Sequence, residues 1–231
     1  MPISVLLLAN TPDPDRTVAA AARLCYSDVS AVDIAEGIRS EDVSRFIGHL
    51  RSSGHLSPFE HAAFTFAIDG ISRVCSHQLV RHRMASYSQQ SQRYVHMKEP
   101  EVITPPSLSS KPEVLDLFTR AVTEAHDAYR KMLESGIPAE DARYILPHGW
   151  ATKIVVTMNA RELHHFFAMR LCRRAQWEIR DLARRMLISA REKAPLLFSL
   201  AGPDCLTRGR CFESKPCGKP FSSMEEVLSG C

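Results

Sequence analysis

The chain has 231 residues, of which 45% are hydrophobic and 24% are charged, with a formal net charge of +3. This is the composition of an ordinary folded globular protein, and it excludes a largely disordered chain and a membrane protein. The small net charge also argues against non-specific nucleic-acid binding, although clustered arginines could still build a local positive site. Because the length suits one large domain and no linker is visible, we expect one domain over residues 1–200 and a cysteine-containing tail over residues 201–231.

The first third of the chain predicts strands and helices in alternation. The apolar run 3–9 predicts a buried strand; it is too short to cross a membrane and lacks a basic leader, so we expect a cytoplasmic protein without a membrane anchor. Asp13 or Asp15 can cap a helix that reaches residue 24, and Ser40 can cap another that ends at Gly54.

The next elements surround a polar segment. Residues 64–68 alternate large apolar with small or polar side chains, which predicts a half-buried strand that ends at the Asp69–Gly70 turn. Helical spacing then returns over residues 72–83, where Gln78 and Arg81 would share one face. Residues 85–92 lack apolar periodicity and predict an ordered loop.

The second half is mainly helical. Residues 112–135 predict a long amphipathic helix, 138–146 a shorter one carrying Arg143, and 152–158 a strand. Asn159 and Glu162 form an N-terminal capping pair for a helical stretch that runs to about residue 193, with a break near Cys172. The pattern predicts an α+β fold with a small, mostly antiparallel sheet and packed helices.

Seven cysteines, an odd number, favour reduced thiols in a chain without a secretory signal. Cys205, Cys211 and Cys217 are evenly spaced, and Cys231 ends the chain. This spacing matches no common zinc pattern and has no histidine nearby. Ordinary thiols in an irregular tail are therefore favoured over a structural metal.

The segment 78–93 is the most chemically dense part of the chain, because Arg81, His82 and Arg83 are followed, after seven intervening residues, by Ser91. It supplies many hydrogen-bond donors and almost no negative charge, which suits a multiply anionic small molecule. The chain has neither of the usual glycine-rich phosphate loops. Any nucleotide must then be held by side chains, and the planar guanidinium of arginine is the natural substitute.

Two other chemistries receive little support from the residue pattern. Ser86, Ser88 and Ser91 lie near His82 in sequence, but no nucleophile elbow surrounds them and no acid is placed to orient the histidine. The ten histidines lack metal-ligand spacing, so we expect no metal.

The motif Arg81-His82-Arg83-x7-Ser91 resembles the signature of the flavin-dependent thymidylate synthases. Further matching segments are His55-x-Ser57-Pro-Phe-Glu60-His61, Ala142-Arg143-Tyr-Ile-Leu-Pro147, and Asn159-Ala-Arg161 followed by Met169-Arg170 and Glu178. They follow the family's order over about residues 15–195. Gln89 stands where some members carry an acidic residue, and the cysteine tail lies outside the resemblance.

The resemblance implies synthesis of dTMP from dUMP, with 5,10-methylene-tetrahydrofolate as carbon donor and NADPH as reductant of a bound FAD. It also implies a homotetramer whose active sites are shared between subunits. Arg170 would be catalytic: a guanidinium beside the uracil ring stabilises developing negative charge, so that no enzyme nucleophile is needed.

Site residues follow from the resemblance position by position. The dUMP-binding set is Gln78, Leu79, Val80, Arg81, Gln89, Gln90, Ser91, Gln92, Arg93, Arg143 and Arg170. The FAD-binding set is Ser57, Glu60, Arg81, His82, Arg83, Gln89, Asn159, Ala160, Arg161 and His165.

Two rival functions stay open at this point. A nucleic-acid-binding module could use the arginines with Tyr87 and Tyr94 as stacking groups, although the chain lacks a basic stripe. Alternatively, a related flavoprotein could act on another substrate, because fold and cofactor do not fix the reaction.

Overall fold

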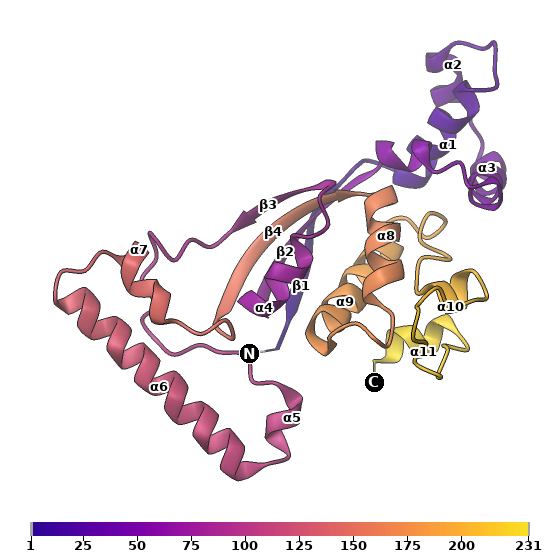
Figure 1. Cartoon of the computed structure of the whole chain (residues 1–231). Helices are drawn as coiled ribbons and strands as arrows, with labels where there is room; N and C mark the ends of the chain where they lie inside the picture. Colours follow the sequence, from indigo (N-terminus) through magenta and orange to yellow (C-terminus); the bar gives the residue numbers. More distant parts are fainter. Residues whose placement is uncertain (1, 231) are drawn as a thin grey trace. The chain divides into compact units, whose positions relative to one another are not determined.

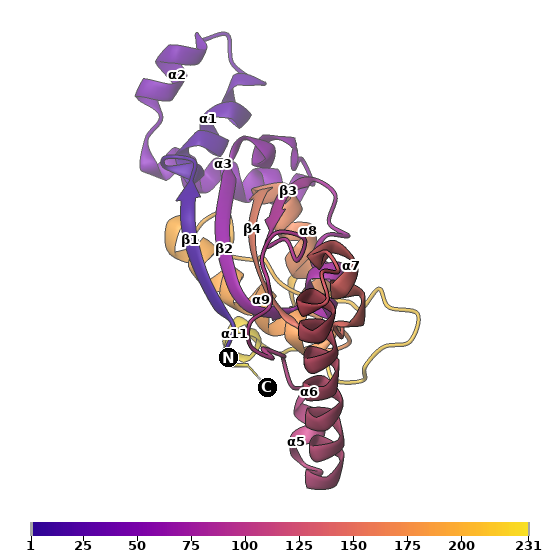
Figure 2. The same ribbon diagram turned by 90° about the vertical axis from the view of Figure 1, so that its left-hand side faces the viewer.

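The computed structural model describes residues 2–230 and contains a four-stranded antiparallel sheet with packed helices. The strands follow the spatial order β1-β2-β4-β3, and Figure 2 shows the central pair β2 and β4 side by side. Their bounds are Ser4–Asn10 (β1), Ala63–Ser72 (β2), Ala85–Gln89 (β3) and Ala151–Asn159 (β4). The predicted α+β class with a small antiparallel sheet is confirmed.

Helices form most of the remaining regular structure (Figure 1). Their bounds are Pro14–Leu24 (α1), Ala31–Gly37 (α2), Ser40–Ser53 (α3), Arg73–Leu79 (α4), Pro106–Ser109 (α5), Pro112–Glu134 (α6), Ala139–Ala142 (α7), Ala160–Arg170 (α8), Trp177–Lys193 (α9), Asp204–Thr207 (α10) and Met224–Ser229 (α11), with 3-10 turns at Ser57–His61 (η1) and Arg143–Ile145 (η2). Within the described residues, no helix is both long enough and apolar enough to cross a membrane.

Several predicted helix ends are confirmed by their capping contacts. The side chain of Asp13 accepts a hydrogen bond from the Arg16 amide at the start of α1, and that of Asn159 accepts one from the Glu162 amide at the start of α8. Gly54 ends α3 at a φ of 74°, in the left-handed region where glycine carries no steric penalty.

The chain divides into two compact units, and the boundary falls inside β2, β3 and β4. Unit 1 consists mainly of Ile68–Arg81 and Ser88–Ile154. Unit 2 consists of Val5–Ala67, His82–Tyr87 and the residues from Val155 onward. The division at residue 200 that the sequence predicts stays a prediction.

Unit 2 has an aromatic core. Phe64, on the buried face of β2, meets Phe198 edge to face with ring centroids 5.2 Å apart, and Phe167 of α8 packs on the same ring. Asp15 in α1 is buried and accepts hydrogen bonds from the amides of Leu196 and Leu197, at 3.1 and 3.0 Å. These contacts fix the segment after α9 against the N-terminal helix.

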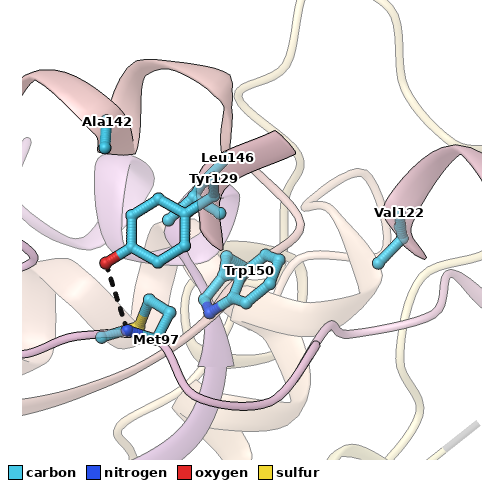
Figure 3. Close-up of a cluster of buried hydrophobic side chains, with 6 residues drawn as sticks. All are labelled: Met97, Val122, Tyr129, Ala142, Leu146 and Trp150. Carbon is cyan, nitrogen blue, oxygen red and sulfur yellow. Dashed lines mark hydrogen bonds between the residues drawn. The ribbon is translucent and has the colours of Figure 1, made fainter. Parts of the chain in front are cut away.

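Unit 1 has a separate core beneath the long helix α6 (Figure 3). Tyr129 and Trp150 are its largest side chains, and both are almost fully buried. The Tyr129 hydroxyl accepts a hydrogen bond from the Met97 amide at 3.3 Å, which anchors the irregular segment before α5. The complete cluster is Met97, Val122, Tyr129, Ala142, Leu146 and Trp150.

Five local predictions are wrong. Strand β1 forms but is not buried, because Leu6 and Leu8 are 61% and 52% exposed. Residues 85–89 form strand β3 rather than a loop, because alternate side chains there are partly buried in spite of their polarity. Helix α4 ends at Leu79, so Arg81 is not on its face. Strand β2 continues through the expected Asp69–Gly70 turn, where Gly70 has a φ of 72°. Arg39 is the N-cap of α3, and Ser40 is its first helical residue.

Replacing Tyr129 by phenylalanine tests the core of unit 1. The change leaves the buried Met97 amide without its acceptor, and we expect the free energy of unfolding to fall by about 1–2 kcal/mol. Tyr144, whose side chain is 85% exposed, is the matched control, and Tyr144→Phe should change stability by less than about 0.5 kcal/mol. Urea denaturation, monitored by circular dichroism, measures both changes. Equal effects of the two substitutions would contradict a stabilising hydrogen bond between Tyr129 and the Met97 amide.

Candidate functional site

The Arg81-His82-Arg83 motif has opposite environments at neighbouring positions. His82 is only 3% exposed, whereas both flanking arginines are exposed. The boundary between the two units falls between Arg81 and His82, so that His82 and Arg83 belong to unit 2. The motif is therefore a buried imidazole with a guanidinium on each side in sequence, and not a uniform charged surface.

In unit 2, His82 connects two charged residues of helix α8. Its Nδ1 lies 3.1 Å from a carboxylate oxygen of Glu162, and its Nε2 lies 3.1 Å from Nε of Arg170. Because the Arg170 Nε–H can only donate, Nε2 of His82 accepts, and the ring proton is on Nδ1, where it is donated to Glu162. The three side chains form a hydrogen-bonded chain in the order Glu162–His82–Arg170.

Electrostatics support this assignment of the proton. Burial, followed by the charges of Arg170 and His165, lowers the pKa of His82 to about 4, so the ring is neutral at pH 7. Burial also raises the pKa of Glu162, although His165 opposes that shift. The Tyr87 hydroxyl donates to the His82 carbonyl at 2.8 Å and so fixes the backbone of residues 82–87.

A cavity of about 1020 Å³ in unit 2 collects several of the predicted flavin residues. Asn159, Arg161, His165 and Glu60 line it, together with Glu162. Arg161 forms an ion pair with Glu60, and Asn159 also caps α8 through the Glu162 amide at 2.9 Å. The structure therefore brings together these four members of the predicted FAD set.

Other members of the FAD set do not line this cavity. Ser57 is exposed at the start of η1, and Ala160 is fully buried, with its amide donating to the Ala62 carbonyl at 2.7 Å. Arg81 and Gln89 belong to unit 1.

Unit 1 holds the predicted dUMP residues other than Arg170, and among them two arginines meet one acidic residue. Arg93 forms an ion pair with the Glu140 carboxylate at 2.8 Å, and Arg143 donates to the Glu140 carbonyl at 3.0 Å. Burial, followed by the charge of Arg143, lowers the pKa of Arg73. Closely placed guanidinium groups of this kind favour an incoming anion.

The polar residues of this set are held by hydrogen bonds within unit 1. The Gln89 amide nitrogen donates to the hydroxyls of Ser76 and Thr152, at 3.0 and 3.1 Å. Gln92 is buried and accepts from Arg73 Nε at 3.4 Å, while the Ser91 hydroxyl accepts from the Arg93 amide at 3.2 Å.

The remaining residues of the dUMP set differ in exposure. Gln78 is half-buried near the end of α4, whereas Leu79 is fully buried in the core. Val80 is 38% exposed. Gln90 is half-buried, and its backbone N–H donates to the Lys153 carbonyl at 2.9 Å.

Comparison with known proteins identifies the family. The family model described as "Thymidylate synthase complementing protein" matches residues 6–196. The chain is 52% identical over 221 residues to a protein named flavin-dependent thymidylate synthase from Geobacter sulfurreducens, with 94% of each chain covered. A protein of the same name from Clostridium tetani is 44% identical over 236 residues, covering 95% of this chain and 94% of its own.

The chain belongs to the flavin-dependent thymidylate synthase family. Its fold also matches a solved structure described as a UMP/dUMP methylase, PolB from Streptomyces cacaoi, bound with 5-Br dUMP. That match has a TM-score of 0.78 at 27% identity and covers 86% of this chain and 94% of the other.

The lining of the unit 2 cavity fits the flavin that the family name implies. Arg51, Arg161 and Arg208 supply positive charge for a diphosphate, while Met84 and Leu56 supply apolar contact area for a ring system. The cavity volume is at the upper end of the range typical of ligand sites.

Unit 2 also contains a cluster of potential metal ligands. Ligand atoms of His82, Glu162 and His165 all lie within 4.8 Å of one another, and this is the one such group found among residues 2–230. Both ring nitrogens of His82, however, are already bonded to protein groups, and Arg170 brings a positive charge beside it. The cluster is therefore better suited to holding Arg170 than to binding a cation.

The sequence pattern does not identify two residues of the site. For Glu162 it indicates only a role in the cap of α8, and it does not show that the carboxylate also contacts His82. Arg73 lies outside the arginine-rich motifs. Its position directly after strand β2 is the one feature that indicates a role in the site. Loops and element ends on a rigid scaffold are where functional side chains concentrate.

The neutral buried histidines predict a pH dependence of stability. The pKa values of His82 and His164 are lowered to about 4, mainly by burial, whereas an unfolded histidine titrates near pH 6.5. Below about pH 6.5 the unfolded chain therefore binds more protons, and we expect the free energy of unfolding to fall as the pH drops from about 6.5 to 4.

Chemical denaturation across this pH range measures the slope. His164→Gln should make it shallower, whereas substitution of exposed His49 by glutamine should leave it unchanged. A slope that is the same in all three proteins would contradict the buried neutral state of His164.

Proposed function

We propose that this protein converts dUMP to dTMP, taking the one-carbon group from 5,10-methylene-tetrahydrofolate and reducing power from NADPH through FAD. The overall reaction balances as dUMP, methylene-tetrahydrofolate, NADPH and a proton giving dTMP, tetrahydrofolate and NADP⁺. The family assignment supports the reaction class, and one structural observation supports the mechanism: a neutral, buried His82 holds the guanidinium of Arg170.

The arginines of unit 2 supply the proposed cofactor contacts. Arg51, Arg161 and Arg208 line the large cavity and would pair with the two phosphates of FAD, while Asn159 and His165 present polar groups to the rest of the cofactor. The bound flavin supplies the electrons that convert the transferred carbon into a methyl group. The other members of the proposed FAD set are Ser57, Glu60, Arg81, His82, Arg83, Gln89 and Ala160.

Arg170 is the proposed catalytic residue. Its guanidinium, placed beside the uracil carbonyl and ring nitrogen, would stabilise negative charge that develops on the ring and would strengthen the ring carbon as a nucleophile. Because His82 is neutral, it accepts from Arg170 and leaves the positive charge on the guanidinium. Glu162 fixes the His82 proton on Nδ1, away from Arg170.

This arrangement gives no support to a serine nucleophile. Nε2 of His82 is occupied by Arg170, and Nδ1 is occupied by Glu162, so the ring has no nitrogen left to accept a serine proton. Ser91 is instead assigned to dUMP binding, together with Gln78, Leu79, Val80, Arg81, Gln89, Gln90, Gln92, Arg93 and Arg143. Arg93 and Arg143 would hold the phosphate, and the ion pair between Arg93 and Glu140 would then be replaced by one between Arg93 and the phosphate.

A homotetramer with shared active sites is part of the proposal. The observation that favours self-association is on β1, where Leu6 and Leu8 are 61% and 52% exposed on one face of the sheet. Contiguous exposed apolar surface is a common mark of an interface. Sedimentation of the purified protein tests this directly.

The whole function is tested with the purified protein. Its visible spectrum should show bound flavin, and formation of dTMP should require dUMP, NADPH and methylene-tetrahydrofolate together. Flavin-containing protein that forms no dTMP from this mixture would contradict the proposed reaction.

Substitution of Arg170 tests the mechanism. We expect Arg170→Ala to lower kcat about 100- to 1000-fold while flavin content is retained, because a charge-stabilising donor is lost from the transition state. Arg170→Lys keeps the charge without the planar fork and should recover only part of the rate.

The matched control is Arg185→Ala on helix α9. Arg185 pairs with Asp181 at 2.9 Å, so its loss should leave kcat near the parent value. An Arg170→Ala enzyme with parent kcat and normal flavin content would contradict the catalytic role.

A further inference from the structure

A second cavity of unit 2 is surrounded by cysteines. Its volume is about 300 Å³, and Cys172, Cys205, Cys211 and Cys217 all contribute to its lining. Cys172 lies in the connection between α8 and α9, Cys205 lies in α10, and the other two lie in the irregular segment that follows. The fold thus places a cysteine from the connection between α8 and α9 in the lining of the same cavity as the three evenly spaced cysteines near the C-terminus.

The irregular segment has little apolar packing of its own. Residues 208–220 are all exposed, and between α10 and α11 the chain forms no helix or strand. Phe221, directly after it, and Val227 in α11 are buried, so the segment is fixed at its C-terminal end. Exposed irregular chain that repeatedly approaches one point is typical of a segment organised by a cross-link or a bound metal.

Arginines of the connection between α8 and α9 bind this segment. Arg173 donates to the Lys219 carbonyl at 2.8 Å and lies over the ring of Phe221, 3.9 Å from its centroid. Arg174 donates to the Lys215 carbonyl. The cavity lining carries the basic residues Arg173, Arg174, Arg210 and Lys219 and the acidic residues Asp204 and Glu213. The excess of basic residues would offset part of the charge of several thiolates.

The backbone around Cys217 suits a thiolate ligand. The Lys219 amide nitrogen lies 3.4 Å from the Cys217 sulfur, and the Lys219 carbonyl oxygen lies 3.5 Å from it. Gly218, between them, has a φ of 73°, which permits the turn that directs the amide toward the sulfur. An amide N–H donated to sulfur favours the ionised form that binds metals.

We propose that Cys172, Cys205, Cys211 and Cys217 bind a zinc ion that fastens the segment 205–217 to the connection between α8 and α9. Four cysteines form a complete tetrahedral set, and zinc is the metal that such structural sites take most often. This proposal replaces the interpretation of these residues as ordinary thiols. The sequence pattern concealed the set because its fourth member, Cys172, precedes helix α9.

The site must contract when the metal binds. In a tetrahedral site with Zn–S bonds of about 2.3 Å the sulfurs lie about 3.8 Å apart, whereas here no three of the four sulfurs lie within 4.8 Å of one another. All four thiols are free, and Cys211 and Cys217 lie in the exposed segment, which can move toward Cys172. We therefore expect zinc to protect residues 208–220 from proteolysis and a chelator to remove that protection.

Metal analysis of the full-length protein tests the proposal. Plasma mass spectrometry should find about one zinc ion per chain. Cys217→Ser should reduce the zinc content below about a tenth of that value, whereas Cys25→Ser, at an exposed cysteine elsewhere in unit 2, should leave it unchanged. Co²⁺ bound in place of zinc should give thiolate charge-transfer absorption that Cys217→Ser removes.

A measurement on the parent protein keeps the test independent of variants that fail to fold. Titration with a mercurial reagent should release the zinc in proportion to the thiols that react. Three results would each overturn the proposal. They are metal-free protein with disulfides among these cysteines, iron with sulfide in place of zinc, and full zinc content in Cys217→Ser. Zinc content is measured separately from flavin and dTMP formation, so failure here is distinguishable from failure of the proposed function.

Discussion

The candidate site depends on one buried side chain, the neutral imidazole of His82 between Glu162 and Arg170. A neutral histidine has one donor and one acceptor, and here each faces the partner that requires it. A protonated ring would present a second donor to Arg170 and place two positive charges in contact. Burial prevents this by lowering the pKa of His82, so the fold itself fixes the proton that orients Arg170.

Helix α8 supplies most of this arrangement because of its local sequence. Asn159 caps α8, which places Glu162 in its first turn and Arg170 at its last residue. Arg161 and His165 are four residues apart and line the same cavity. One helix therefore carries residues that line the large cavity and both partners of His82, while the segment before β3 contributes only the imidazole.

The sequence predicted the elements whose patterns are local, and it failed where tertiary contacts decide. The cap at Asp13, the end of α3 at Gly54 and the alternation of Phe64 and Phe66 follow from short-range rules. Strand β3 was missed because its side chains are mostly polar, and its pairing with β4 is long-range. Two features follow only from the fold: His82 points inward between two exposed arginines, and Cys172 lines one cavity with the late cysteines.

Nitrogen-15 NMR of histidine-labelled protein measures the central claim most directly, since it reports which ring nitrogen of His82 carries the proton. We expect a proton on Nδ1 and none on Nε2 at pH 7. Glu162→Gln should allow the other tautomer to appear, because an amide can donate as well as accept. A His82 that is protonated on Nε2, or on both nitrogens, at pH 7 in the parent protein would contradict the assigned Glu162–His82–Arg170 arrangement.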